Sequence, residues 1–300
     1  MPGRKLAKTK KVSVLVVGDV IEDILVSPSG AIRPDTDTNA SIQVSNGGSA
    51  ANFACWLASE GVEVNFVGRV AASDLESHSK DLKSHGVTPH LQADQDLATG
   101  RIVVLVEGEQ RSFLTDRGAN QNLDLDAIPD ELFDKALYIS GYSLLSADSR
   151  SIRRLITKAR NLGCLVVCDP GSAGFIEDFG ANRFLEALVG VDVFLPSFSE
   201  GRILTGEARP EVISAMLRER FPLVALTLGA EGVQICQSEE NFHVPAPLAD
   251  LIDATGAGDA FAASFLKSLL HGETSQVAAA KAVRAGAIAV TRHGGRPGRH

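Results

Sequence analysis

The chain has 300 residues, 44% of them hydrophobic, which is enough to bury a large core in one α/β domain. Its formal net charge of −8 argues against nucleic acid or a membrane surface as a partner, because both attract clustered positive charge. The four cysteines form no Cys-x-x-Cys pair, which favours reduced, buried thiols in a cytoplasmic protein over a zinc site or a disulfide framework.

The N-terminal residues differ in composition from the rest of the chain. Lysine and arginine are concentrated in residues 1–11, where we expect a disordered basic tail. No apolar run follows that could act as a signal peptide or cross a membrane. Beyond the tail no stretch has the composition of a long linker, so residues 12–300 are expected to form a single domain.

The first elements after the tail alternate between strand and helix patterns. An apolar, β-branched run over residues 12–17 predicts a buried strand. Apolar side chains at helical spacing predict a helix over residues 49–60, directly after Gly47 and Gly48. Residues 62–67 are expected to form the next strand.

Two stretches do not fit this alternation. Residues at about 27–45 are polar and contain a short alternating piece that suits a half-exposed strand. Residues at about 95–116 contain two strand-like runs that predict a hairpin turning near Gly108. We expect these stretches to form a small β-lid.

The second half of the chain repeats the alternation of strand and helix. The predicted strands are residues 136–140, 165–168, 192–195 and 223–228, and the predicted helices are residues 149–161, 211–220, 258–270 and 277–290. This order predicts a mostly parallel sheet with helices on both faces, a three-layer α/β/α fold. Ligands bind such sheets beyond the carboxyl ends of the strands. Asp169 follows one predicted strand, where it could form a pocket edge or a strand-ending turn, and the turn is favoured.

The stretch from Asp253 to Asp259 is the most informative, and it reads Asp-Ala-Thr-Gly-Ala-Gly-Asp. Its two glycines allow a ligand to approach the backbone closely, and the helix expected to begin here directs unpaired N–H groups toward that ligand. Together with the helix dipole, these groups predict a phosphate pocket. Acidic residues favour the first turn of any helix, so Asp259 taken alone also has an ordinary structural explanation.

Two other nucleotide-binding patterns are missing. Phe261 stands where the dinucleotide fingerprint needs its third glycine, and the chain has no Gly-x4-Gly-Lys-Ser/Thr loop. A nicotinamide-dependent oxidoreductase is therefore disfavoured. The histidines have no metal-ligand spacing, and His78 is expected to be solvated.

Several segments resemble, in the same order, the motifs of the ribokinase-like (PfkB) carbohydrate kinase family. Residues 253–259 are similar to its C-terminal signature, and residues 47–52 to its N-terminal Gly-Gly motif. The further similar segments are residues 17–23, 118–120, 227–232 and 285–294. The resemblance covers nearly the whole chain and implies a ribokinase-like fold with ATP-dependent phosphorylation of an alcohol.

The resemblance implies a role for each matching residue. Asp259 would be the base that takes the proton from the acceptor hydroxyl, beside backbone amides that stabilise the transferred phosphoryl group. The residues implied for catalysis are Asp259, Gly256, Ala257 and Gly258. The residues implied for acceptor binding are Asp23 on the substrate loop after the first strand, together with Gly47, Gly48 and Asn52.

ATP and Mg²⁺ are the cofactors that the resemblance implies. The residues matched on the nucleotide side are Thr227, Gly229, Gly232 and Ser197. Glu200 matches the carboxylate that supports Mg²⁺ through water, whereas Ser197 replaces the asparagine usual in that motif and has less reach. Asp253 and Thr255 match positions that bind a monovalent cation in many relatives, so potassium is a further expectation.

The acceptor stays open at this point. A small sugar resembling ribose, fructose or ketodeoxygluconate is favoured, with a nucleoside as the alternative. A phosphorylated acceptor would need positive side chains, for which Arg101, Arg111 and Arg117 are the candidates. A non-catalytic sugar- or nucleotide-binding regulator is a second alternative, favoured by Ser197 but not by the intact glycine motif. Edge strands of the lid also suggest a homodimer through the lid.

Overall fold

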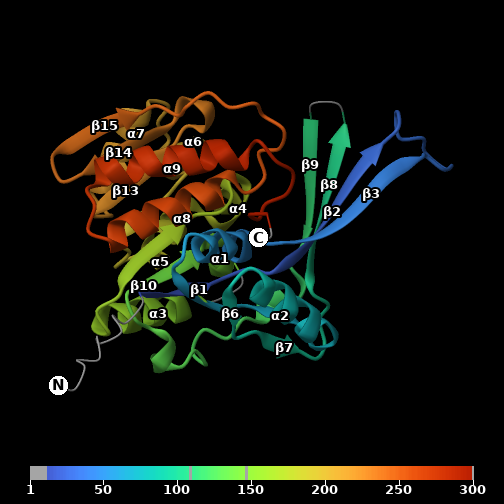
Figure 1. Ribbon diagram of the computed structural model, residues 1–300, viewed down its shortest axis with the longest axis horizontal. Helices are drawn as coiled ribbons and strands as arrows, with labels where there is room; N and C mark the ends of the chain where they lie inside the picture. The colour runs from blue at the N-terminus through green and yellow to red at the C-terminus, as the bar shows by residue number, and fades with distance from the viewer. Residues whose placement is uncertain (1–11, 108–109, 146–147, 299–300) are drawn as a thin grey trace, which may run out of the picture.

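The computed structural model describes residues 12–298 except residues 108–109 and 146–147, and Figure 1 shows how its elements are arranged. The basic tail predicted at residues 1–11 lies outside the described residues. A body of sheet and helices carries a small four-stranded sheet, the lid, on one side. Among the described helices, none combines the length and hydropathy that a bilayer-spanning segment requires.

The body is organised around a nine-stranded sheet. In spatial order its strands are β15 (Glu240–Val244), β14 (Val233–Gln237), β13 (Leu223–Thr227), β12 (Val193–Phe194), β11 (Leu165–Asp169), β10 (Ala136–Ser140), β1 (Ser13–Val17), β4 (Glu63–Val67) and β6 (Val87–Pro89). All neighbours from β6 to β13 pair in parallel, and only β13, β14 and β15 pair antiparallel. The mostly parallel central sheet is confirmed.

Alternate side chains of each strand enter two separate hydrophobic cores, one on each face of the sheet. In β1, Val14 and Val16 belong to one core and Leu15 and Val17 to the other. The first core is covered by α1 (Ser49–Ser59), α2 (Leu75–Ser84), α8 (Ala257–Leu270) and α9 (Ser275–Ala289). The second is covered by α3 (Ser149–Asn161), α4 (Ala173–Phe179), α5 (Ala181–Ala187), α6 (Phe198–Thr205) and α7 (Pro210–Arg218). The predicted α/β/α layering is confirmed.

The lid consists of four strands in the order β3-β2-β8-β9. Their bounds are β3 (Ala40–Gly47), β2 (Ile21–Pro28), β8 (Gly100–Glu107) and β9 (Gln110–Asp116). β2 pairs in parallel with β8, and the other two pairs are antiparallel. The first lid strand begins at Ile21, so Asp23 lies on a strand and not on the loop that the sequence suggested.

Smaller elements connect the lid to the body. A two-stranded sheet pairs β5 (Arg69–Ala71) with β7 (Gln92–Asp94). Short 3-10 turns occur at Ala72–Asp74, Gly118–Asn122, Asp130–Leu132, Gly141–Leu145 and Gly229–Glu231. In the second of these, Asn120 accepts a hydrogen bond from the Val20 amide at 3.0 Å and donates one to the Val20 carbonyl at 2.8 Å. This pair of bonds anchors the start of β2, and with it the lid, to the body.

Several predicted bounds shift by a few residues. The strand predicted at residues 192–195 contains only Val193–Phe194 in regular pairing, and the helix predicted at residues 277–290 begins at Ser275 because Thr274 caps it. His78 is a correction of another kind. It was expected to be solvated, but it is 3% exposed on α2 because it faces the interior.

Candidate active site

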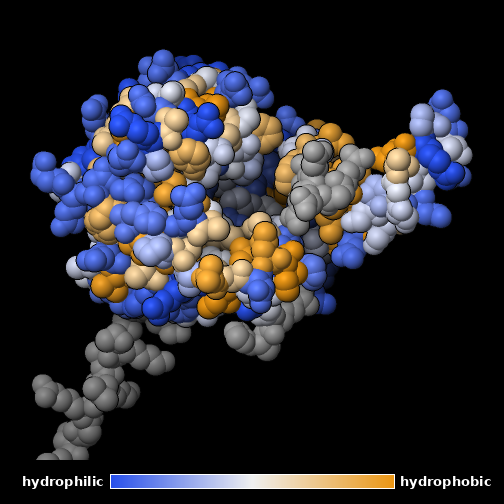
Figure 2. All heavy atoms as spheres, turned by 90° about the horizontal axis from the view of Figure 1, so that it is seen from above, coloured by the Kyte–Doolittle hydropathy of each residue, from blue (hydrophilic) through white to orange (hydrophobic). Residues whose placement is uncertain are grey.

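Two adjoining cavities lie where the lid meets the carboxyl ends of the parallel strands. The larger, of about 600 Å³, is lined by Asp23 and Phe113 from the lid and by Asn52 from the body. The smaller, of about 170 Å³, is lined by residues of the body alone. Ser49 and Asp259 line both cavities and so mark their junction. Figure 2 shows the molecule hollowed between body and lid.

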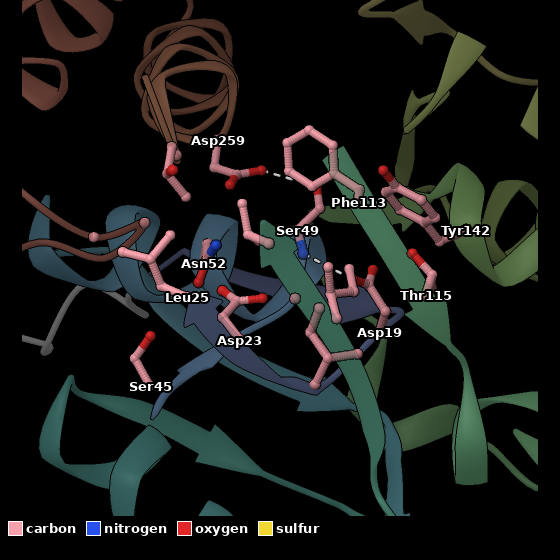
Figure 3. A pocket seen from close by; sticks show the side chains of 18 of the residues that line it. Asp19, Asp23, Leu25, Ser45, Ser49, Asn52, Phe113, Thr115, Tyr142 and Asp259 are labelled. Carbon is pink, nitrogen blue, oxygen red and sulfur yellow. Dashed lines mark hydrogen bonds between the residues drawn. The ribbon is translucent and has the colours of Figure 1, made fainter. Parts of the chain in front are cut away.

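Asp259 is held at this junction by its helix and by a hydrogen bond. It lies in the first turn of α8 and is 8% exposed, and the Ser49 hydroxyl donates to its Oδ1 at 2.8 Å (Figure 3). Burial raises the pKa of Asp259 from its ordinary value of 3.8 to about 7, with smaller contributions from Asp19 and Asp23, while hydrogen bonds from Ser49 and Asn52 oppose the increase. A carboxylate of this pKa can accept and release a proton near neutral pH.

The start of α8 has the geometry of an anion site. Gly256 caps the helix with φ 79°, a left-handed conformation that favours glycine. The Ala257 amide donates to the Ala254 carbonyl at 3.3 Å. Among the described residues, the amides of Gly258 and Asp259 have no hydrogen-bond acceptor. A methyl group added at Gly258 would meet only open space, so this glycine leaves room for a ligand and not for a packed neighbour.

The Gly-Gly motif precedes α1, and its capping group comes from elsewhere in the chain. Gly48 occupies the N-cap with φ 99° and has no side chain to accept from the helix amides. Asp19, directly after β1, accepts from the Ser49 amide at 2.7 Å and from the Ala50 amide at 3.2 Å. This carboxylate at the positive end of α1 fixes Ser49, and hence the hydroxyl that holds Asp259. Sequence reasoning missed both Asp19 and Ser49.

Gly47 and the Asp23 carboxylate are in close contact. A methyl group on Gly47 would lie 2.1 Å from the Asp23 Oδ2 atom, so the glycine leaves the space that this carboxylate occupies. Burial raises the pKa of Asp23 to about 6, although the positive charge of Arg296 lowers it. Asp23 therefore faces the larger cavity as a carboxylate that is ionised at neutral pH.

Asn52 lies on α1, 5% exposed, and lines the larger cavity. Its Oδ1 atom accepts from the Arg296 Nε atom at 3.1 Å, which leaves its amide hydrogens as donors. Of the four residues predicted to bind the acceptor, Asp23, Gly48 and Asn52 line the larger cavity, whereas Gly47 packs against the Asp23 carboxylate and does not line it. Arg296 was not predicted, because nothing in the local sequence indicates that the C-terminal residues return to α1.

The motif of Ser197 and Glu200 forms a capping box at the start of α6. The Ser197 amide donates to Glu200 Oε2 at 2.7 Å, and the Glu200 amide donates to Ser197 Oγ at 3.4 Å. Both residues line the smaller cavity. Burial raises the pKa of Glu200, and its hydrogen bonds with Ser197 oppose this. The serine hydroxyl therefore caps the helix, a role that an asparagine side chain could also fill.

Asp169 also reaches the smaller cavity, where it lies together with Glu200 and Asp259. The turn was favoured over a pocket edge for this residue, and Asp169 has both features, since it also accepts from the Gly171 amide at 3.0 Å. Burial raises its pKa well above the ordinary value, and the charges of Glu200 and Asp259 raise it further. Crowded buried carboxylates are the oxygen ligands that Mg²⁺ prefers, so the residues here suit this ion. Within the described residues, no group of three or more His, Cys, Asp or Glu forms a complete metal site.

The predicted ATP-side loop reaches the cavities only in part. Thr227 ends β13 and lines the smaller cavity. Gly229 and Gly232 lie in the following turn and line neither cavity. Gly232 has φ 107°, and a methyl group there would lie 2.1 Å from the Val244 carbonyl oxygen, so its glycine is required by the turn itself.

Asp253 and Thr255 line the larger cavity, and hydrogen bonds within the loop engage both. Asp253 Oδ1 accepts from the Thr255 amide at 3.0 Å and from the Thr255 hydroxyl at 2.7 Å. Its Oδ2 atom accepts from the Gly294 amide at 3.1 Å. The Asp253 carboxylate therefore shapes the loop and ties it to the C-terminal residues.

The lid arginines do not form a shared positive cluster in the described structure. Arg101 pairs with Glu22 at 2.8 Å, and Arg117 lies over the Phe175 ring at 4.4 Å from its centroid. Arg117 lines the larger cavity, whereas the Arg111 side chain lies outside the described residues.

Comparison with known proteins shows the family and the fold of the chain. Residues 11–299 match the family description "pfkB family carbohydrate kinase". A fructokinase from Escherichia coli is 28% identical, with 85% of this chain and 84% of the relative covered. An adenosine kinase structure from Sinorhizobium meliloti is 25% identical with a TM-score of 0.85 over 96% of each chain. A putative ribokinase II from E. coli, in complex with ATP and Mg²⁺, is 22% identical with a TM-score of 0.82 over 96% of each chain.

Proposed function

The chain belongs to the pfkB family of carbohydrate kinases and is a sugar or nucleoside kinase, and from this membership we propose that it transfers the γ-phosphoryl group of ATP to a hydroxyl of a small sugar. One observation carries the proposal. A buried carboxylate, Asp259, lies at the junction of two cavities and beside free helix amides. The acceptor occupies the larger cavity and the phosphoryl group the smaller one.

Asp259 acts as the base in this proposal. Its pKa of about 7 suits removal of a proton from the acceptor hydroxyl as the new P–O bond forms. The amides of Gly258 and Asp259 donate to the phosphoryl oxygens, on which charge grows during transfer. The Ser49 hydroxyl keeps the carboxylate directed at the junction.

The cofactors follow from the same cavities. Mg²⁺ neutralises charge on the ATP phosphates when bound, and Asp169 and Glu200 are the carboxylates that would hold it or its waters. Thr227 is the residue of the predicted ATP-side loop that faces this cavity. A potassium ion beside the loop of Asp253 and Thr255 would be bound by backbone oxygens, because the Asp253 carboxylate is already hydrogen-bonded.

A nucleoside is the second candidate acceptor, and the lid favours it. Strand register aligns Leu25 with Val104, and Val104 with Phe113, in one row. Ile102 adds to this apolar wall and is the register partner of Asp23 on the same face of the lid. A free sugar would leave hydroxyls unpaired against such a wall, whereas the base of a nucleoside would cover it.

The charge around the larger cavity points to an uncharged acceptor. The acidic residues that line it are Asp19, Asp23, Asp253 and Asp259. The basic residues that line it are Arg117 and His293. A phosphorylated acceptor would add negative charge next to these carboxylates. Such an acceptor is therefore disfavoured.

Release of ADP in a panel of sugars, nucleosides and phosphorylated sugars tests the proposal, with and without potassium. We expect ATP- and Mg²⁺-dependent turnover with an unphosphorylated acceptor and the phosphorylated product by mass spectrometry. A folded protein that binds ATP and a sugar but transfers nothing across the panel would instead be a regulator on a kinase fold.

A homodimer through the lid and a cytoplasmic location complete the proposal. The outer face of the lid carries Ile42 and Leu114, each 63% exposed. A second lid would cover these side chains, and the oligomeric state by light scattering tests this. The four free, buried cysteines agree with a reducing compartment.

A further inference from the structure

The C-terminal residues 293–296, here called the strap, connect the two halves of the active site. On one side the Gly294 amide donates to Asp253 Oδ2 of the anion loop at 3.1 Å. On the other side the Trp56 indole of α1 donates to the Gly295 carbonyl at 2.9 Å. The strap is therefore bonded to both the anion loop and the helix that follows the Gly-Gly motif.

Close packing fixes the position of the strap between these elements. A methyl group on Gly295 would lie 2.4 Å from Asn52 Nδ2, and one on Gly256 would lie 2.3 Å from the Gly295 carbonyl oxygen. Since contacts this short cannot exist, only glycine allows Asn52, the strap and the anion loop to stack in this order. A shift of the strap would consequently displace both Asn52 and the anion loop.

Arg296 extends from the strap beneath the acceptor motif. Its Nε atom donates to Asn52 Oδ1 and its Nη2 atom to the Gly47 carbonyl, both at 3.1 Å. Its Nη1 atom pairs with Asp81 of α2. The side chains of Arg296 and Asp81 are 9% and 11% exposed, so water competes little with these bonds.

The planar guanidinium determines which way its partners face. Because Arg296 can only donate, the oxygen of the Asn52 amide must face it, and the amide hydrogens are directed to the other side, where Asn52 hydrogen-bonds Asp259. The bond to the Gly47 carbonyl fixes the peptide next to the space occupied by Asp23. One arginine thus orients Asn52, which lines the larger cavity, and the Gly47 peptide, which packs against Asp23.

We propose that Arg296 is a positioning residue that sets the donor direction of Asn52 and the Gly47–Gly48 backbone for acceptor binding. The inference rests on the proposed function, since it assigns these groups to the acceptor. Arg296 itself lines neither cavity. Its loss should therefore weaken acceptor binding selectively.

Steady-state kinetics of Arg296→Ala with both substrates varied tests the proposal. We expect the KM for the acceptor identified in the panel to rise roughly 10- to 100-fold, as for lost hydrogen bonds to a charged group, with little change in the KM for ATP. Arg296→Lys keeps the charge without the fork and should recover only part of the loss. The matched control is Arg154→Ala on α3, which breaks an exposed ion pair between Arg154 and Asp126. This variant should leave both KM values unchanged.

An equal change in both constants, or a lower melting temperature with unchanged constants, would overturn the proposal. A crystal structure of Arg296→Ala decides the question independently of turnover. The Asn52 amide should rotate or the Gly47 peptide should move, and an unchanged arrangement contradicts a positioning role. If the wild-type protein transfers phosphate to no acceptor, the proposed function fails while this structural comparison still stands.

Discussion

The anion loop and the acceptor side of this site are built by different means. The loop, residues 253–259, presents consecutive backbone groups at a helix start that depends on Gly256. The acceptor side assembles Asp23 from the lid, Asn52 from α1 and Arg296 from the strap. Substitutions in the loop should therefore act on phosphoryl transfer, whereas those on the acceptor side should act on recognition.

Asp259→Asn is expected to have the largest effect, because it removes the base at the point where the two regions meet. Turnover should fall roughly 10²- to 10⁴-fold, while the fold and ATP binding remain. Initial rates of purified, folded protein measure this. Asp130→Asn, at an exposed side chain paired with Lys158, is the control. Turnover within a few-fold of wild type would remove Asp259 from the role of base.

The same substitution has a consequence for stability. The pKa of Asp259 is raised from 3.8 to about 7, so ionisation destabilises the folded protein increasingly as pH rises between these values. The neutral asparagine avoids this penalty. Above pH 7 the melting temperature of Asp259→Asn should therefore exceed that of the wild type. The difference should vanish below pH 3.8, the ordinary pKa of the carboxyl.

Two glycines of the anion loop should respond in opposite ways. Gly258→Ala meets open space inside a helix, so we expect about 0.5–1 kcal/mol of added stability, although the methyl group displaces the phosphoryl group and lowers turnover by up to roughly 10²-fold. Gly256 has a left-handed backbone conformation, and the methyl group of Gly256→Ala would collide with Gly295. We therefore expect this variant to be about 1–3 kcal/mol less stable than the wild type. Chemical denaturation and initial rates on both variants measure this. Reduced stability in Gly258→Ala would show that the glycine serves packing.

The contrast also explains what the sequence could predict. The α/β/α layers and the anion loop follow from local periodicity and from two closely spaced glycines, which a single sequence contains. Asp19, Asp169 and Arg296 act through partners far along the chain, and nothing next to them indicates those partners. Asp169 in particular follows a strand, where a turn is the commoner explanation.

Ser49→Ala sharpens the junction between the two regions. The Ser49 hydroxyl stabilises the ionised form of Asp259, so its loss should raise the pKa of that carboxyl above about 7. The acid limb of the pH–rate profile should move to higher pH, and neutral turnover should fall roughly 10-fold. Ser49→Thr keeps the hydroxyl and should keep the profile. An unshifted acid limb in Ser49→Ala would separate Ser49 from the base.

Leu25→Ala should have the smallest effect and acts only on the acceptor side. Leu25 belongs to the apolar lid wall with Val104 and Phe113, so its truncation removes contact with whatever covers that wall. For a nucleoside acceptor we expect kcat/KM to fall about 5- to 10-fold, with the KM for ATP unchanged. For a free sugar, which leaves the wall uncovered, the same substitution should change little.

Ile24→Ala is the matched control for Leu25→Ala. Ile24 precedes Leu25 on the same strand, so its side chain lies on the opposite face of the lid. Its register partners are Val44 and Val103. Both variants remove the same number of carbon atoms from β2, so general loosening of the lid would affect them equally. A loss confined to Leu25→Ala, and to nucleosides, assigns the wall to a base. Equal losses with sugars and nucleosides would show that the wall only stabilises the lid, and the small sugar would remain the better acceptor.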